Sequence, residues 1–161
     1  MIRIAAVSIG LLCLIGCSSD TEKTLTDSPT LSRFRKGEFL LLRLNGNRHP
    51  GEAVPSGTKL LHGWEILESL QIRKPRDRAK IFLAFEAGED DARRNPGIPV
   101  DCFQPRHAIR ITANGTTIDH LICFECQNFM TWTNGEMTGS GPISDHPKAT
   151  FESYFDAAPR R

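Results

Sequence analysis

The residues best suited to chemistry are three cysteines in the second half of the chain. Cys102 opens the segment "CFQPRHAIR", and Cys123 and Cys126 form a Cys-x-x-Cys pair in "LICFEC". Cysteines can form a disulfide, bind zinc or act as redox-active thiols. Between the two segments lies Asn114-Gly115, which is typical of a two-residue hairpin turn and sets the register of the strands on either side.

That register predicts one apolar face of a sheet. Residues opposite each other across the turn share a face, as do residues two apart along a strand. The face collects His107, Ile109, Ile111, Ile118, His120, Ile122, Phe124 and Cys126. Because most of these side chains are apolar, we expect the face to point towards the core.

A disulfide between Cys102 and Cys126 follows from the same pattern. Ile98, Val100 and Cys102 occupy even positions, whereas the apolar residues Ile109 and Ile111 of the next strand occupy odd positions. A one-residue β-bulge near Pro105 is therefore needed to keep Ile98 and Val100 on the apolar face. This bulge places Cys102 opposite Cys126, within disulfide range. Cys123 is then left over on the opposite face, and it is the partner if the register is different.

The alternative for the cysteines is a metal site. Cys102, His107, Cys123 and Cys126 have the residue types of a Cys₃His zinc site. However, three-residue spacing on a strand puts Cys123 and Cys126 on opposite faces, and "LICFECQNFM" has no Gly or Pro to form a tight turn. Free or redox-active thiols are the third interpretation, although a thioredoxin-like Cys-x-x-Cys pair opens a helix and here the context is a strand.

His107 and His120 are the other candidate residues. We expect them to be diagonal neighbours at the edge of the core, hydrogen-bonded to the backbone. The alternative is a paired imidazole site for acid–base chemistry or a metal. Asp119 is expected on the outer face, in an exposed ion-pair ladder with Arg106 and Arg110. No nucleophile accompanies the histidines, so the sequence predicts no catalytic residues and no cofactor.

The elements that position these residues predict an α+β domain with about five strands, in the order strand–strand–helix–strand–strand–strand–helix. Both helices are expected on one face of an antiparallel sheet. The signals are strands over residues 39–44 and 60–72, a helix from Pro75 to a cap at Gly88, three strand segments divided by Asn114-Gly115 and Asn134-Gly135, and a helix from Pro147. The charged "EDDARRNPG" is expected to be a loop.

The start of the chain predicts its location. Residues 4–16 are uncharged and shorter than the roughly 20 residues of a membrane-spanning helix, which is typical of a signal peptide. The segment Leu14-Ile15-Gly16-Cys17 resembles the lipobox of bacterial lipoproteins. This resemblance implies cleavage before Cys17, a diacylglyceryl group on its thiol and acylation of its amine, for example with palmitate. Ser18, where Asp would imply retention in the inner membrane, implies the outer membrane if the host has two membranes.

We therefore expect a signal peptide over residues 1–16, the lipidated cysteine and a flexible polar tether over residues 17–37, and a single domain over residues 38–161. The formal net charge of the whole chain is only +1, which gives no reason to expect nucleic acid as a partner.

The two cysteine segments together are similar to a CFxPRHxIR…ICFxC motif of uncharacterised bacterial lipoprotein and secreted domains, over about residues 60–155. The resemblance implies a folded domain but no activity. The expected function is a lipid-anchored envelope lipoprotein, a non-enzymatic binding or structural module that contacts membrane lipid and an unidentified envelope partner. The alternative is a metal-binding protein or enzyme that uses Cys102, Cys123, Cys126, His107 and His120.

Overall fold

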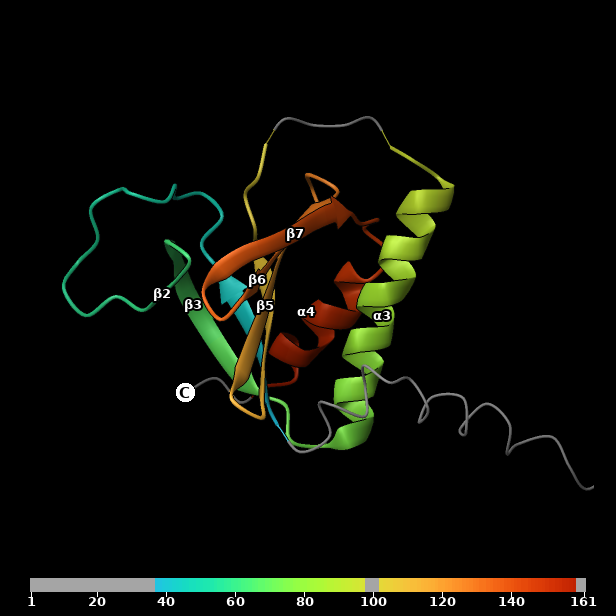
Figure 1. Ribbon diagram of the computed structural model, residues 1–161, viewed down its shortest axis with the longest axis horizontal. Helices are drawn as coiled ribbons and strands as arrows, with labels where there is room; N and C mark the ends of the chain where they lie inside the picture. The colour runs from blue at the N-terminus through green and yellow to red at the C-terminus, as the bar shows by residue number, and fades with distance from the viewer. Residues whose placement is uncertain (1–36, 98–101, 159–161) are drawn as a thin grey trace, which may run out of the picture.

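The computed structural model describes residues 37–97 and 102–158, which form a seven-stranded antiparallel sheet with two helices on one face (Figure 1). The elements are β1 (Glu38–Leu44), β2 (Leu60–Leu61), β3 (Trp64–Gln71), α3 (Pro75–Arg94), β4 (His107–Ala113), β5 (Thr116–Cys123), β6 (Asn128–Thr133), β7 (Glu136–Pro142) and α4 (Lys148–Asp156). The strand order is β2-β3-β1-β4-β5-β6-β7. The predicted α+β class is confirmed, but the predicted strand number was too low.

Several predictions fall outside the described residues. These concern the signal peptide over residues 1–16, the lipidated Cys17, the tether except Gly37, and the strand residues Ile98 and Val100. Among the residues that the structure does describe, no helix is long and apolar enough to cross a membrane.

The extra strands arise from turns inside segments that were predicted to be continuous. His62 and Gly63 have positive φ angles of 48° and 88°, and they divide the predicted strand over residues 60–72 into β2 and β3. A second turn separates β5 from β6, where the Gln127 N–H donates to the Phe124 carbonyl (3.3 Å). Gln127 has a φ of 52°, which non-glycine residues seldom adopt, so its residue type carried no turn signal.

The predicted register around Asn114-Gly115 is confirmed. Ile109 pairs with His120, and His107 pairs with Ile122. Both turn residues have positive φ angles, 52° and 77°, as a type I′ turn requires. A local backbone preference therefore places the two histidines on neighbouring strands.

The first helix begins at Pro75 as predicted, but it continues through Gly88 to Arg94, so "EDDARR" is helical and not a loop. Gly88 lies where α3 meets the start of α4. A Cβ atom there would lie 2.5 Å from Cγ of Pro147, the residue before α4. The glycine thus permits the close approach of the two helices and does not end the first one.

Apolar side chains form a cluster on each face of the sheet. The cluster under the helices includes Phe39, Leu41, Ile109, Ile111, Ile122, Phe85 and Phe151. The cluster on the other face is formed by Leu42, Leu44, Leu61, Trp64, Ala108 and Leu121. Because β1 is buried on both faces, its sequence is a nearly continuous apolar run.

Candidate functional site

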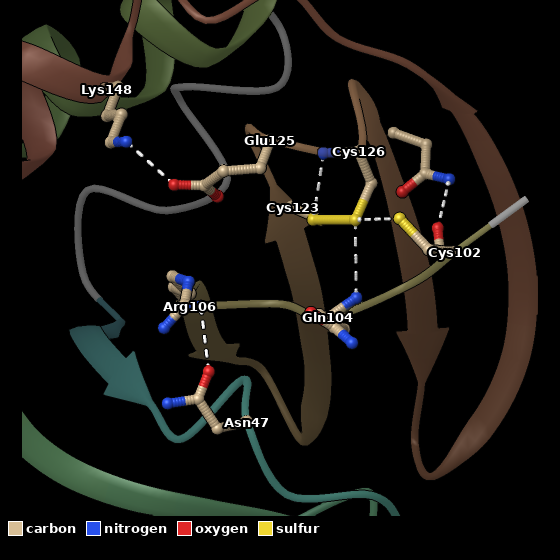
Figure 2. Close-up of a disulfide and its surroundings, with 9 residues drawn as sticks. Asn47, Cys102, Gln104, Arg106, Cys123, Glu125, Cys126 and Lys148 are labelled. Carbon is tan, nitrogen blue, oxygen red and sulfur yellow. Dashed lines mark hydrogen bonds and ion pairs between the residues drawn. A yellow bond between two sulfur atoms is a disulfide. The ribbon is translucent and has the colours of Figure 1, made fainter. Parts of the chain in front are cut away.

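Three cysteine sulfur atoms meet at the end of β5 (Figure 2). Cys123, the last residue of β5, forms a disulfide with Cys126 in the following turn. Sγ of Cys102, which precedes β4, lies 3.0 Å from Sγ of Cys126. In the view of Figure 2 the sulfur atoms lie in a row, with Cys126 between the other two. The site is therefore a disulfide with a third thiol against one of its sulfur atoms.

This pairing corrects the predicted Cys102–Cys126 disulfide. The prediction assumed that the strand continues through Cys126, which would put Cys123 and Cys126 on opposite faces. The turn over residues 124–127 instead reverses the chain and brings the Cα atoms of Cys123 and Cys126 to 5.1 Å. The predicted bulge near Pro105 is also absent, because the described residues 102–106 lie outside any strand. Only the proximity of Cys102 to Cys126 agrees with the prediction.

The three cysteine residues differ in their exposure to solvent. Cys123 is 0% exposed and Cys126 is 4% exposed, whereas Cys102 is an exposed free cysteine. Of the three residues, Cys102 is thus the one that is exposed to solvent.

Hydrogen bonds hold the backbone around the sulfur atoms. The Cys126 N–H donates to Cys123 Sγ (3.1 Å), and the Gln104 N–H donates to Cys126 Sγ (3.4 Å). Beside the disulfide, Lys148 at the start of α4 donates to Glu125 in the turn (2.7 Å). The turn is therefore tied to α4, and the segment containing Cys102 is tied to the turn.

His107 lies apart from the three cysteines of the alternative zinc site. Within residues 37–97 and 102–158, no group of three or more His, Cys, Asp or Glu side chains is arranged to hold a metal ion. His107 lies under the helices and contacts Glu152 of α4. Cys123 lies two residues after Leu121 on β5 and therefore on the same face of the sheet, and Leu121 packs in the cluster on the face opposite His107. The two sides of the sheet thus separate the imidazole from the sulfur atoms.

His107 is the buried member of a partly exposed network that joins α4 to the sheet. Its Nε2 atom lies 2.8 Å from Oε1 of Glu152, and Arg43 of β1 contacts the other oxygen at 2.5 Å. Burial lowers the pKa of His107, although the charge of Glu152 opposes this shift. The imidazole donates from Nε2, since a carboxylate only accepts. Its buried Nδ1 atom has no hydrogen-bond partner among the described residues.

His120 has its own partner on a different strand. Its Nδ1 atom lies 3.0 Å from the Thr131 hydroxyl of β6. Its ring packs against Phe85 and Phe129, with centroid distances of 4.8 and 6.3 Å. This apolar packing removes water from the imidazole and lowers its pKa to about 4. The position of both histidines on the inner face is confirmed, but their partners are side chains and not the predicted backbone groups.

Asp119 is buried, so the prediction of an exposed ion-pair ladder is wrong. It is 2% exposed and accepts two hydrogen bonds from Arg110, at 2.7 and 2.8 Å. A third comes from Nε2 of His62 at 2.7 Å. Arg106 instead donates to Asn47, at 2.9 Å. The bonds to Asp119 raise the pKa of the Arg110 guanidinium. Together with the bond from His62, they satisfy the hydrogen-bonding needs of the buried carboxylate.

The position of His62 explains why Asp119 is buried. His62 forms the β2–β3 turn, yet β1 and β4 lie between β3 and the strand that carries Asp119. The sheet must therefore curl to bring the two side chains together. The His62 ring also stacks on Trp132 of β6, with centroids 4.4 Å apart. This contact covers the Asp119 carboxylate and holds the β2–β3 hairpin over the apolar cluster on the face of the sheet away from the helices.

Sequence reasoning missed three of these residues. Glu152 and Arg43 have no local signal, because each is one of many charged residues and only packing brings them to His107. His62 precedes Gly63 at the hairpin turn, and that glycine was the available signal.

No protein-family model, curated protein or solved structure matches this chain. Around His107, His120 and Asp119, each of these polar contacts holds one element against another. The cysteine cluster, with its exposed thiol beside a disulfide, is the arrangement capable of chemistry.

Proposed function

We propose that the protein is a lipid-anchored lipoprotein of the cell envelope, and that its domain is a non-enzymatic binding or structural module. The observation that carries the proposal is the segment Leu14-Ile15-Gly16-Cys17. Its cysteine follows a small residue at the border between an apolar segment and a polar one, and a branched apolar residue lies three positions before it. Ser18 favours the outer membrane in a host that has two membranes.

The domain supports this proposal in two ways. Its Cys123–Cys126 disulfide fits an oxidising compartment such as the envelope. In addition, the buried ionisable side chains His107 and Asp119 are occupied by structural partners, which suits a stable module better than an active site. Acyl chains on Cys17 would then hold the module at the membrane, where lipid is its first partner.

The Cys17→Ser variant tests the anchor. It should lose labelling by radioactive palmitate and keep the length of the unprocessed chain, because serine has no thiol to accept the lipid. Cys13→Ser is the matched control, since Cys13 lies in the same apolar segment. This control should be labelled and processed like the wild type. Mature-length, palmitate-labelled protein from Cys17→Ser would refute the proposal.

A further inference from the structure

We infer that Cys102, Cys123 and Cys126 form a thiol–disulfide exchange site. In this site the Sγ atom of Cys126 is the shared sulfur, because it forms a disulfide bond with either Cys123 or Cys102. The substrate class is a thiol, either a small molecule or part of a protein, which reacts with the buried disulfide through Cys102. The inference goes beyond the proposed lipid anchor and does not depend on it.

The geometry of the three sulfur atoms carries the inference. Exchange requires a thiolate to attack one sulfur of a disulfide, and the other sulfur then leaves. Cys102 Sγ already lies 3.0 Å from Cys126 Sγ, within the range of approximately 3–3.5 Å that characterises near-attack geometry. In Figure 2, Cys102 lies on the side of Cys126 away from Cys123, which is the side from which displacement occurs.

The exchange step is balanced without an external oxidant. Cys102 loses its proton to water, and its thiolate attacks Cys126 Sγ. The Cys102–Cys126 bond forms while the Cys123–Cys126 bond breaks, and the electron pair of the broken bond stays on Cys123 Sγ. The N–H of Cys126, already 3.1 Å from that sulfur, stabilises the leaving thiolate until it takes a proton from solvent. One disulfide is present before and after the step.

The differences in exposure explain how an external thiol takes part. Cys123 is fully buried and Cys126 nearly so, so a thiol from solvent has little access to the bond between them. After exchange, one sulfur of the disulfide belongs to the exposed Cys102. A solvent thiolate can then attack Cys102 Sγ and form a mixed disulfide, and Cys126 leaves as a thiolate that takes up a proton. A second external thiolate then attacks the sulfur of the first external thiol; the two external thiols form a disulfide, and Cys102 leaves as a thiolate that takes up a proton.

The rate of reduction by glutathione tests the role of Cys102. The full chain, purified in detergent, is incubated with reduced glutathione, and samples are quenched with acid and alkylated. The loss of the Cys123–Cys126 bond should be slower in Cys102→Ser than in the wild type by about tenfold or more, because the intramolecular attack is absent. Glu136→Gln, an exposed residue at the end of the β6–β7 hairpin away from the cysteines, is the control and should react like the wild type. Equal rates for Cys102→Ser and the wild type, with unchanged circular dichroism, would overturn the inference.

Peptide mapping tests the shared sulfur independently. Trypsin places Cys102 on peptide 95–106 and both other cysteines on peptide 111–148, and cleavage after Glu125 separates Cys123 from Cys126. Under oxidised glutathione, Cys123→Ser should form a Cys102–Cys126 link between the two peptides. Cys126→Ser should form no link between Cys102 and Cys123. Two free thiols in Cys123→Ser, or an equally rapid link in Cys126→Ser, would contradict the assignment of Cys126 as the shared sulfur.

Discussion

Replacing His120 with glutamine should remove a pH dependence from the stability of the domain. Burial lowers the pKa of His120 from 6.5 to about 4 in the folded protein. Between these values the unfolded chain binds more protons than the folded chain, so the free energy of unfolding falls as the pH falls. From pH 7 to pH 5, the His120 contribution to this fall is about 2 kcal/mol.

Urea unfolding at the two pH values, followed by tryptophan fluorescence, measures this contribution. The wild type should lose about 2 kcal/mol more than His120→Gln between pH 7 and pH 5. The comparison removes the effect of His107, whose pKa is also lowered and whose contribution has the same sign. His49→Gln, which changes an exposed histidine, should keep the wild-type pH dependence. The same loss of stability in His120→Gln and in the wild type would refute the reasoning.

Two further variants test contacts between elements by the same urea unfolding assay. Asp119→Asn should lower the free energy of unfolding by about 1–3 kcal/mol, because it weakens the hydrogen bonds that the buried carboxylate accepts from Arg110 and His62; a loss below about 0.5 kcal/mol would contradict this role. Gly88→Ala should cost about 1–3 kcal/mol, since the new methyl group would overlap Pro147. Gly139→Ala, where a Cβ atom meets nothing within 4 Å, should change stability little, and equal effects of the two glycine variants would argue against the close helix contact.

Predictions based on local signals agree well with the structure. Pro75 begins a helix because its ring fixes φ and its missing N–H is not needed there. Asn114-Gly115 forms the predicted turn, and the resulting register places His107 and His120 on the inner face. These features depend on the backbone preferences of one or two residues, so the sequence contains them directly.

Predictions that needed long-range contacts were less successful. Gly88 was interpreted as a helix cap because glycine often ends helices, but its role depends on Pro147, far along the chain. Asp119 was expected to be exposed because its own strand contains no sign of His62, which the curl of the sheet brings to it. In both cases the residue type was informative, but the partner that explains it was not local.

For the cysteines, the sequence by itself determined the residue types, their spacing and the Asn114-Gly115 register of the two strands between Cys102 and Cys123. It also supplied the lipobox segment on which the proposed envelope location depends. Only the tertiary structure decided that Cys126 is bonded to Cys123. The reason is the turn over residues 124–127, in which Gln127 adopts a positive φ. No local preference of glutamine favours that conformation; packing of β6 against β5 and the tie to α4 hold the turn that places one exposed thiol against a buried disulfide.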